Sequence, residues 1–160
     1  MTIGRHLSLR LRAVTTFILR QDSSGAKVLL LKRAHSALAG IWCQVAGAIK
    51  GGETAWQAAL REVREETGLV PDRFYSADIC EQFYNAYKDR VELVPVFVAF
   101  VDSPRTIALN QEHSDYRWLS IPEAINLLPF PGQRDLLRTI EEQFVQREPN
   151  ELLRIPPKKL

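Results

Sequence analysis

Two short apolar runs separated by a polar break open the chain's regular pattern. Residues 11–19 are rich in aliphatic and β-branched side chains, residues 21–25 are mostly polar and end in glycine, and residues 27–31 are largely apolar again. This pattern predicts a β-hairpin. The segments expected next are a loop at 35–40, a short strand at 41–45 and a glycine-bearing loop at 47–52.

The clearest helix is predicted at 54–67. Thr54, with Gln57 three residues later, fits a capping box, and Gly68 suits the left-handed residue that ends many helices. The remaining elements are expected as strands at 74–84, 91–101 and 116–119 and as helices at 122–128 and 132–146. Mixed strands with one central and one terminal helix predict a layered α/β domain.

Length and composition narrow the class of protein. A chain of 160 residues is expected to form one domain, with a core at about 9–147 and a tail at 148–160, of which residues 154–160 are expected to be frayed and solvated. The net charge of +2 is too small to favour nucleic acid or a membrane surface as a partner, and no apolar run is long enough to cross a bilayer. Cys43 and Cys80 lack metal-binding spacing and are expected in the core of a cytoplasmic protein.

Acidic residues gather beside the apolar stripe of the predicted helix. At about 100° per residue, the residues of the stripe that packs on the sheet are Trp56, Ala59, Leu60, Val63 and Thr67. Glu62, Glu65 and Glu66 fall in a sector that begins at the edge of this stripe. Like charges beside a buried face repel one another unless cations bind between them or protons are taken up. Hard divalent ions such as Mg²⁺ take carboxylate oxygens, so the two interpretations are a metal site and a solvated acidic face.

The surrounding pattern favours the metal site. Gly47, then Glu53 after five residues, then REVREETGL at 61–69 after seven more, fill every specified position of GX5EX7REUXEEXGU. The segment therefore resembles a complete Nudix box. That resemblance implies the Nudix fold, which is an α/β/α sandwich with a mixed β-sheet. It also implies a Mg²⁺-dependent hydrolase in which Mn²⁺ can substitute.

The resemblance assigns metal ligands as well. It implies that Glu62 and Glu66 bind the ion directly, and that Glu65 binds an ion or a water molecule on it. A backbone carbonyl at the start of the box, from Ala46 or Gly47, would complete the shell, and the sequence does not choose between them.

Glu53 and Arg61 match box positions that usually form an orienting ion pair. Arg61 also lies next to Glu65 on the helical wheel, where a guanidinium would hold a carboxylate in ligating geometry. A structural role is expected for both residues of the pair, with direct catalysis as the alternative. Gly47 and Gly52 are expected to permit tight loop conformations and close approach of substrate.

Three residues outside the box are considered for the reaction. In several Nudix enzymes, a glutamate shortly before a late strand is the base that accepts a proton from the attacking water. Glu112 stands in such a place and is expected to be that base or an additional metal ligand, with a surface glutamate as the alternative. His113 beside it is expected to be an incidental loop residue. Arg33, at the end of the second strand, is a candidate phosphate contact or an exposed charge.

Aromatic residues near the expected site are candidates for stacking on a base. Trp42 and Tyr84 are the predicted substrate contacts, with Phe83 and Tyr87 as further candidates. A packing role is the alternative for each of them.

The expected reaction is hydrolysis of a phosphoanhydride bond in a nucleotide-like small molecule by a monomer or a homodimer. Residues 42–47 and 52–54, with Glu112, His113 and Trp118, resemble the MutT-like subgroup around dihydroneopterin triphosphate diphosphatase, also described as dATP pyrophosphohydrolase. This implies a nucleoside or pterin triphosphate that is cleaved to monophosphate and pyrophosphate. Dinucleoside polyphosphate hydrolysis is the alternative, because tyrosines lie near a position that marks some of those enzymes. A nucleotide-sensing module without turnover is disfavoured, since no ligand glutamate is missing.

Overall fold

The predicted hairpin forms the centre of a mixed β-sheet. The computed structural model describes residues 7–156, and eight strands form one sheet in it. The strands are β1 (Ser8–Arg10), β2 (Ala13–Asp22), β3 (Gly25–Arg33), β4 (Trp42–Cys43), β5 (Val45–Ala48), β6 (Arg73–Asn85), β7 (Arg90–Phe100) and β8 (His113–Ser120). The helices are α1 (Ala55–Thr67), α2 (Ile121–Leu127) and α3 (Pro131–Phe144), followed by the short 3₁₀ helix η1 (Glu151–Leu153).

Parallel and antiparallel pairings are combined in this sheet. β1 and β2 run parallel to β7, whereas β3 pairs with β2 and with β8 in antiparallel fashion, as β6 does with β7. β5 is antiparallel to the first half of β2 and pairs with no other strand in the described part of the chain. One edge of β5 is therefore free, next to the loop that leads into α1.

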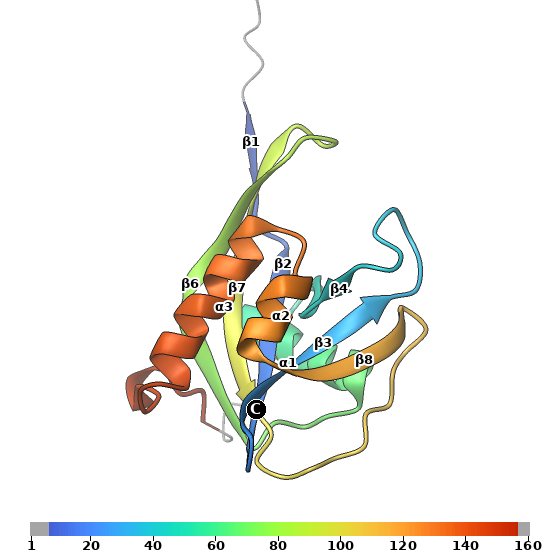
Figure 1. Ribbon diagram of the computed structural model, residues 1–160. Coiled ribbons are helices and arrows are strands. Elements are labelled where there is room, and N and C mark those ends of the chain that lie inside the picture. The colour runs from blue at the N-terminus through green and yellow to red at the C-terminus, as the bar shows by residue number, and fades with distance from the viewer. Residues whose placement is uncertain (1–6, 157–160) are drawn as a thin grey trace, which may run out of the picture.

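Helices cover both faces of the sheet (Figure 1). On one face, α2 and α3 close a core that includes Phe17, Val98 and Leu137. On the other face, α1 closes a second core that includes Ile18 and Val63. Adjacent residues of β2 enter different cores because side chains alternate along a strand. The expected α/β/α sandwich with a mixed sheet is confirmed.

Two strand boundaries at the expected site differ from the sequence prediction. The strand expected at 41–45 is interrupted at Gln44, and β5 continues through Gly47 to Ala48. The first residues of the expected glycine loop thus belong to the sheet, because they pair with β2. β8 begins at His113 rather than Tyr116, since pairing with β3 extends it beyond its apolar residues.

Part of the expected tail is folded onto β6. The Tyr75 hydroxyl donates to Glu151 Oε1 at 2.9 Å, and the backbone N–H of Ile155 donates to the carbonyl of Phe74 at 2.8 Å. The expected fraying is therefore wrong for Arg154, which forms a β-bridge with Tyr75, and for Ile155, whereas residues 157–160 lie outside the described residues.

The two cysteines have different surroundings. Cys43 is buried as expected, but Cys80 is exposed, so its predicted core position is wrong. Within residues 7–156, no helix combines the length and apolarity needed to span a membrane.

Candidate active site

Helix α1 carries the candidate residues, and the expected caps set its ends. The Thr54 hydroxyl accepts a hydrogen bond from the backbone N–H of Gln57 at 3.3 Å, and the Gln57 side chain accepts one from the Thr54 N–H at 2.9 Å. Gly68 ends the helix at φ 73°, in the left-handed region that favours glycine. The predicted capping box and stop are both confirmed, and together they define which residues of α1 face the sheet.

The three carboxylates of α1 differ sharply in burial. Glu66 is 1% exposed, whereas the side chain of Glu62 is 12% exposed and that of Glu65 is 47% exposed. Val63 and Thr67, beside Glu66 on the helix, are fully buried in the core. The acidic sector therefore begins inside the protein and ends in solvent, as the helical wheel predicts.

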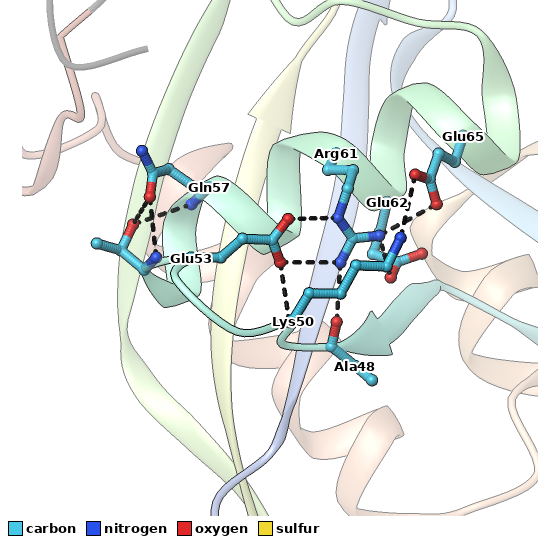
Figure 2. A network of polar contacts seen from close by, with 8 residues as sticks. Ala48, Lys50, Glu53, Gln57, Arg61, Glu62 and Glu65 are labelled. Atoms are coloured by element: carbon cyan, nitrogen blue, oxygen red, sulfur yellow. Dashed lines mark hydrogen bonds and ion pairs between the residues drawn. The ribbon is translucent and has the colours of Figure 1, made fainter.

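Arg61 connects the acidic face of α1 with the segment that precedes the helix (Figure 2). Its Nε donates to Glu53 Oε1 at 2.6 Å, and its Nη2 donates to Glu53 Oε2 at 3.1 Å. Nη1 donates to Glu62 at 2.7 Å and to Glu65 at 3.1 Å. Nη2 also donates to the Ala48 carbonyl at 2.8 Å. One guanidinium thus binds three carboxylates and β5, and the expected ion pair with Glu53 is present.

These contacts favour the charged forms of the ion pair. Hydrogen bonds from Arg61 and from the Lys50 N–H lower the pKa of Glu53 from 4.5 to about 2. The bond to Glu53, followed by the bond to Glu62, raises the pKa of Arg61. This part of the acidic face is therefore ionised and compensated at neutral pH.

Glu66 is only partly compensated, by the charge of Arg33 and a backbone hydrogen bond from Ala46, both of which act to lower its pKa. Its Oε2 is buried, and no group in the described chain donates a hydrogen bond to it. Burial raises the pKa of Glu66, and the charges of Glu62 and Glu112 raise it further, to about 8. A buried carboxylate of this kind is costly unless a proton or a cation meets it. The position therefore suits a cation ligand.

The backbone of β5 lies directly against Glu62. A Cβ atom at Gly47 would collide with the Glu62 carboxyl group, so glycine is required for this approach. Ala46 and Gly47 both pair with β2, which places both candidate carbonyls in the strand that borders α1. Gly52 has φ 84° and occupies the tight turn expected in the following loop.

The chemistry of these oxygen donors fits a divalent cation, although their side chains do not all point at one common position. Glu66 offers an unpartnered oxygen, Glu62 and Glu112 lie within electrostatic reach of it, and carboxylate and carbonyl oxygens are the donors that Mg²⁺ takes. Within residues 7–156, however, no three acidic, histidine or cysteine side chains are arranged to hold one ion. Arg61 is a cause, because it holds Glu62 and Glu65. A cation that took Glu62 as a ligand would therefore share this carboxylate with Arg61.

Strands β3 and β8 bring Arg33 and Glu112 to the buried carboxylate. Glu112 directly precedes β8, and its carbonyl accepts a hydrogen bond from the Ala34 N–H at 2.8 Å. The charge of Glu112 raises the pKa of Glu66, and the charge of Arg33 lowers it. Both residues chosen from the sequence therefore face Glu66 from outside the box.

His113 is not the incidental loop residue that the sequence suggested. It is the first residue of β8, is 6% exposed, and has its Nε2 3.8 Å from Glu66 Oε2. Asn110 Oδ1 accepts a hydrogen bond from the Glu112 N–H and lies 3.2 Å from His113 Nδ1. Nδ1 therefore carries the hydrogen in the neutral ring, and the lone pair of Nε2 faces Glu66. Burial lowers the pKa of His113, which favours this neutral form.

A shift in strand register explains how His113 reaches the site. Lys32 pairs with Asp115, but Arg33 pairs with His113, so Ser114 has no partner. Because side chains alternate along a strand, the shift turns His113 toward α1, away from the face of Asp115. The spacing of residues in the sequence carries no signal for such a bulge.

The aromatic candidates are not gathered at the carboxylates. Trp42 packs against the core under α2 and α3, with Arg117 Cζ 4.7 Å from its ring centroid. Tyr84 is exposed, and its hydroxyl donates to Asp89 at 2.8 Å. Phe83 points to the opposite face of β6 from Tyr84 and lines a cavity. Of the aromatic residues considered from the sequence, Phe83 is thus better placed than Tyr84 to contact a ligand.

Comparison with known proteins gives a consistent result. The family model described as NUDIX domain matches residues 9–143. The bis(5'-nucleosyl)-tetraphosphatase (asymmetrical) of Mus musculus is 32% identical over 136 residues, which cover 81% of this chain and 88% of that protein. A binary complex of the Caenorhabditis elegans Ap4A hydrolase has a TM-score of 0.71 at 25% identity, covering 81% of this chain and 94% of that one. The Escherichia coli dihydroneopterin triphosphate pyrophosphohydrolase has a TM-score of 0.68 at 26% identity, covering 88% and 99%.

Proposed function

The chain belongs to the Nudix family of hydrolases, and on that premise we propose that it uses Mg²⁺ to hydrolyse a phosphoanhydride bond in a nucleoside polyphosphate. The observation that carries the proposal is the state of Glu66, a buried carboxylate with an unpartnered oxygen beside Glu62 and Glu112. Keeping Glu66 ionised near neutral pH requires a cation. A polyphosphate substrate requires a cation for the same electrostatic reason.

The position of each carboxylate determines the role that we propose for it. Glu62 and Glu66 would hold the ion, together with a carbonyl of β5 from Ala46 or Gly47. When bound, Mg²⁺ neutralises phosphate oxygens and makes a water molecule more acidic. Glu112, in the turn that directly precedes β8, would accept a proton from the attacking water or add a ligand.

The positively charged residues have complementary roles. Arg33 lies across the site from α1 and contacts a substrate phosphate, which would also offset the charge of Glu66. Arg61 is a positioning residue, since four of its hydrogen bonds orient Glu53, Glu62 and Glu65, and a fifth fixes its guanidinium to the Ala48 carbonyl. Glu65, the most exposed of the three helix carboxylates, binds the ion through water from its place beside Arg61.

Two substrate classes are candidates for this site. The relatives favour the dinucleoside polyphosphates, which the sequence ranked second, over the nucleoside or pterin triphosphates, which it ranked first. The mouse relative, similar over 81% of this chain, is named a bis(5'-nucleosyl)-tetraphosphatase, which supports a dinucleoside polyphosphate as the first candidate. The Escherichia coli structure, named a dihydroneopterin triphosphate pyrophosphohydrolase, supports a nucleoside or pterin triphosphate as the second. In the second case the products would be a monophosphate and pyrophosphate.

A substrate panel tests the proposal. Diadenosine tetraphosphate, ATP, dATP, dihydroneopterin triphosphate and ADP-ribose would each be incubated with the protein and Mg²⁺, and again with EDTA, and products separated by ion-exchange chromatography. We expect Mg²⁺-dependent cleavage of diadenosine tetraphosphate, of a triphosphate or of both, and none in EDTA. Glu66→Gln controls for contaminating hydrolases. Tight nucleotide binding by calorimetry without any Mg²⁺-dependent product would instead identify a sensing module.

A further inference from the structure

A cavity of about 440 Å³ lies across β5 from the carboxylates of α1, and its size is typical of small-molecule sites. Ala48 and Ala13, which pair between β5 and β2, form part of its wall. Alternation along β5 places Gly47 on the opposite face, against Glu62. Because the other edge of β5 is unpaired in the described chain, a ligand that crosses this edge contacts both sites.

Positive charge dominates the cavity. Arg10, Arg12 and Arg90 line it, together with one carboxylate, that of Glu92. Arg90 Nη2 lies 2.6 Å from Glu92 Oε1, so these two charges neutralise each other. Across residues 7–156, neither Arg10 nor Arg12 takes part in an ion pair. Two guanidinium groups are therefore available to an anion.

An aromatic ring provides the second kind of surface. Phe83 lines the same cavity and is 44% exposed. It pairs with Glu92 in the β6–β7 ladder, so both side chains lie on the same face of the sheet. An exposed ring stacks on nucleobases, and guanidinium groups bind phosphate. The combination matches a nucleoside phosphate better than an uncharged base or a simple anion.

The cavity is joined to the carboxylates through β5. The Ala48 carbonyl accepts a hydrogen bond from Arg61 Nη2 at 2.8 Å, and the preceding Gly47 lies against Glu62. Since one strand residue spans about 3.3 Å, the cavity begins close to the place where the proposed function puts the cleaved bond. One extended ligand is thus able to occupy both.

We propose that this cavity binds a nucleoside phosphate unit on the far side of the cleaved bond, which makes the protein prefer substrates with a nucleotide at each end of the phosphate chain. The inference rests on the proposed function. A nucleoside triphosphate carries all its charge on one side of its nucleoside. A triphosphate that is cut to a monophosphate and pyrophosphate has a nucleoside on only one side of the cleaved bond, and its short pyrophosphate, held at Glu62 and Glu66 through the ion, ends before Arg10 and Arg12. A dinucleoside polyphosphate satisfies both charged sites and also offers a second base to Phe83.

The test compares diadenosine tetraphosphate with ATP in steady-state kinetics. The variant Arg10→Ala/Arg12→Ala removes both free guanidinium groups, and Arg138→Ala/Arg147→Ala is a control with the same change in charge on exposed residues of α3 and the segment after it. We expect KM for diadenosine tetraphosphate to rise at least about tenfold in the first variant, as loss of charge-assisted hydrogen bonds predicts. Both kcat values and KM for ATP should stay within about twofold, and the control should match wild type.

Phe83 gives a second, independent measurement. Phe83→Leu should raise KM for diadenosine tetraphosphate several-fold, because an aliphatic side chain cannot stack on a base, and Phe83→Tyr should restore it. Thermal unfolding of each variant with and without diadenosine tetraphosphate shows whether a folded protein has lost ligand binding.

The outcomes separate this inference from the proposed function. Equal increases of KM for both substrates would mean that the cavity holds the only nucleoside, and unchanged KM values would mean that it holds none; either result overturns the inference. Wild-type protein that cleaves ATP but not diadenosine tetraphosphate overturns it too, while the proposed function stands. Wild-type protein that cleaves no member of the panel overturns both.

Discussion

Arg61 and Glu66 lie on the same helix, but their charges are compensated to different extents. Neighbouring groups compensate the charge of Arg61, whereas Oε2 of Glu66 has no donor. Around Arg61, every nitrogen of the guanidinium has an acceptor, and the two Glu53 oxygens both have donors. Around Glu66, a buried Oε2 lies 3.8 Å from His113 Nε2, and no group in the described chain donates a hydrogen bond to this oxygen. The charges around Arg61 therefore compensate one another, whereas the carboxylate of Glu66 needs a proton or a cation to compensate it.

This difference suits a stabilising role for the Arg61 region and fits the ligand-binding role that we propose for the Glu66 region. Charge-assisted hydrogen bonds around Arg61 stabilise the fold and hold the loop before α1 against β5. The surroundings of Glu66 destabilise its charged form, and natural proteins retain such groups where a ligand compensates them. The two regions meet at Glu62, which is bonded to Arg61 and raises the pKa of Glu66.

The same contrast gives the two regions opposite dependence on pH. Glu53 has a lowered pKa. Its ionised form therefore stabilises the folded protein fully above pH 4.5, and this stabilisation is lost as the pH falls through about 2. Glu66 has a raised pKa. Its contribution to the free energy of unfolding is therefore greatest below pH 4.5, where the carboxyl is protonated in both states, and is lost as the pH rises through about 8. Near neutral pH, the Arg61 region therefore contributes its full stabilisation, whereas the stabilisation from the Glu66 region is already decreasing.

The largest expected effect is on turnover after Glu66→Gln. The variant removes a negative charge from the proposed ion site, and an ion supplies several kcal/mol of charge stabilisation in the transition state. We expect kcat to fall by roughly three to five orders of magnitude, measured with Mg²⁺ on the best substrate of the panel. Glu148→Gln, at an exposed position, is the matched control. Turnover close to wild type would remove Glu66 from the site.

The same substitution should stabilise the protein when no metal is present. In wild type, the free energy of unfolding should fall by a few kcal/mol between pH 5 and pH 8.5, at up to about 1.4 kcal/mol per unit of pKa shift. In Glu66→Gln the fall should be much smaller, because a neutral amide does not titrate. Urea unfolding in EDTA at several pH values measures both. Parallel curves for the two proteins would contradict the raised pKa of Glu66.

Addition of Mg²⁺ sharpens that comparison. At pH 8, the ion should raise the unfolding temperature of wild type more than that of Glu66→Gln, since it compensates the charge that burial opposes. Equal shifts would place the ion elsewhere.

A smaller effect is expected in the compensated region. Arg61→Ala leaves Glu53, Glu62 and the Ala48 carbonyl without their shared donor, so the free energy of unfolding at pH 7 should fall by about 2 kcal/mol. Arg61→Lys should recover only part of this loss, because an ammonium cannot reproduce the planar guanidinium contacts. Urea unfolding measures both variants, and Arg64→Ala, at an exposed position of the same helix, is the control. Full stability in Arg61→Ala would mean that the network is dispensable.

Local patterns in the sequence predicted the parts of the site that lie on α1. Helical periodicity placed the carboxylates beside the apolar stripe, and Thr54, Gln57 and Gly68 marked the ends of the helix. The apolar runs predicted the strands of the sheet with small errors at their ends. These features succeed because they depend on interactions between residues that are close in the chain.

Contributions from distant strands were harder to anticipate. Resemblance to the family points to Arg33 and Glu112, whereas nothing in the sequence distinguishes His113 from an incidental loop residue or Phe83 from the other aromatic residues. A bulge in the β3–β8 pairing turns His113 inward, and the register of β6 with β7 sets the face of Phe83. Registers of this kind follow from the packing of whole strands, which no short segment specifies.

The sequence by itself determined the helix, its caps, its acidic sector and the family to which the chain belongs. Only the tertiary structure decided that Oε2 of Glu66 is buried without a donor, that Arg61 binds Glu62, and that Arg10, Arg12 and Phe83 share a cavity. The physical reason is that burial and electrostatic compensation arise between segments far apart in the chain, after the sheet has brought them together.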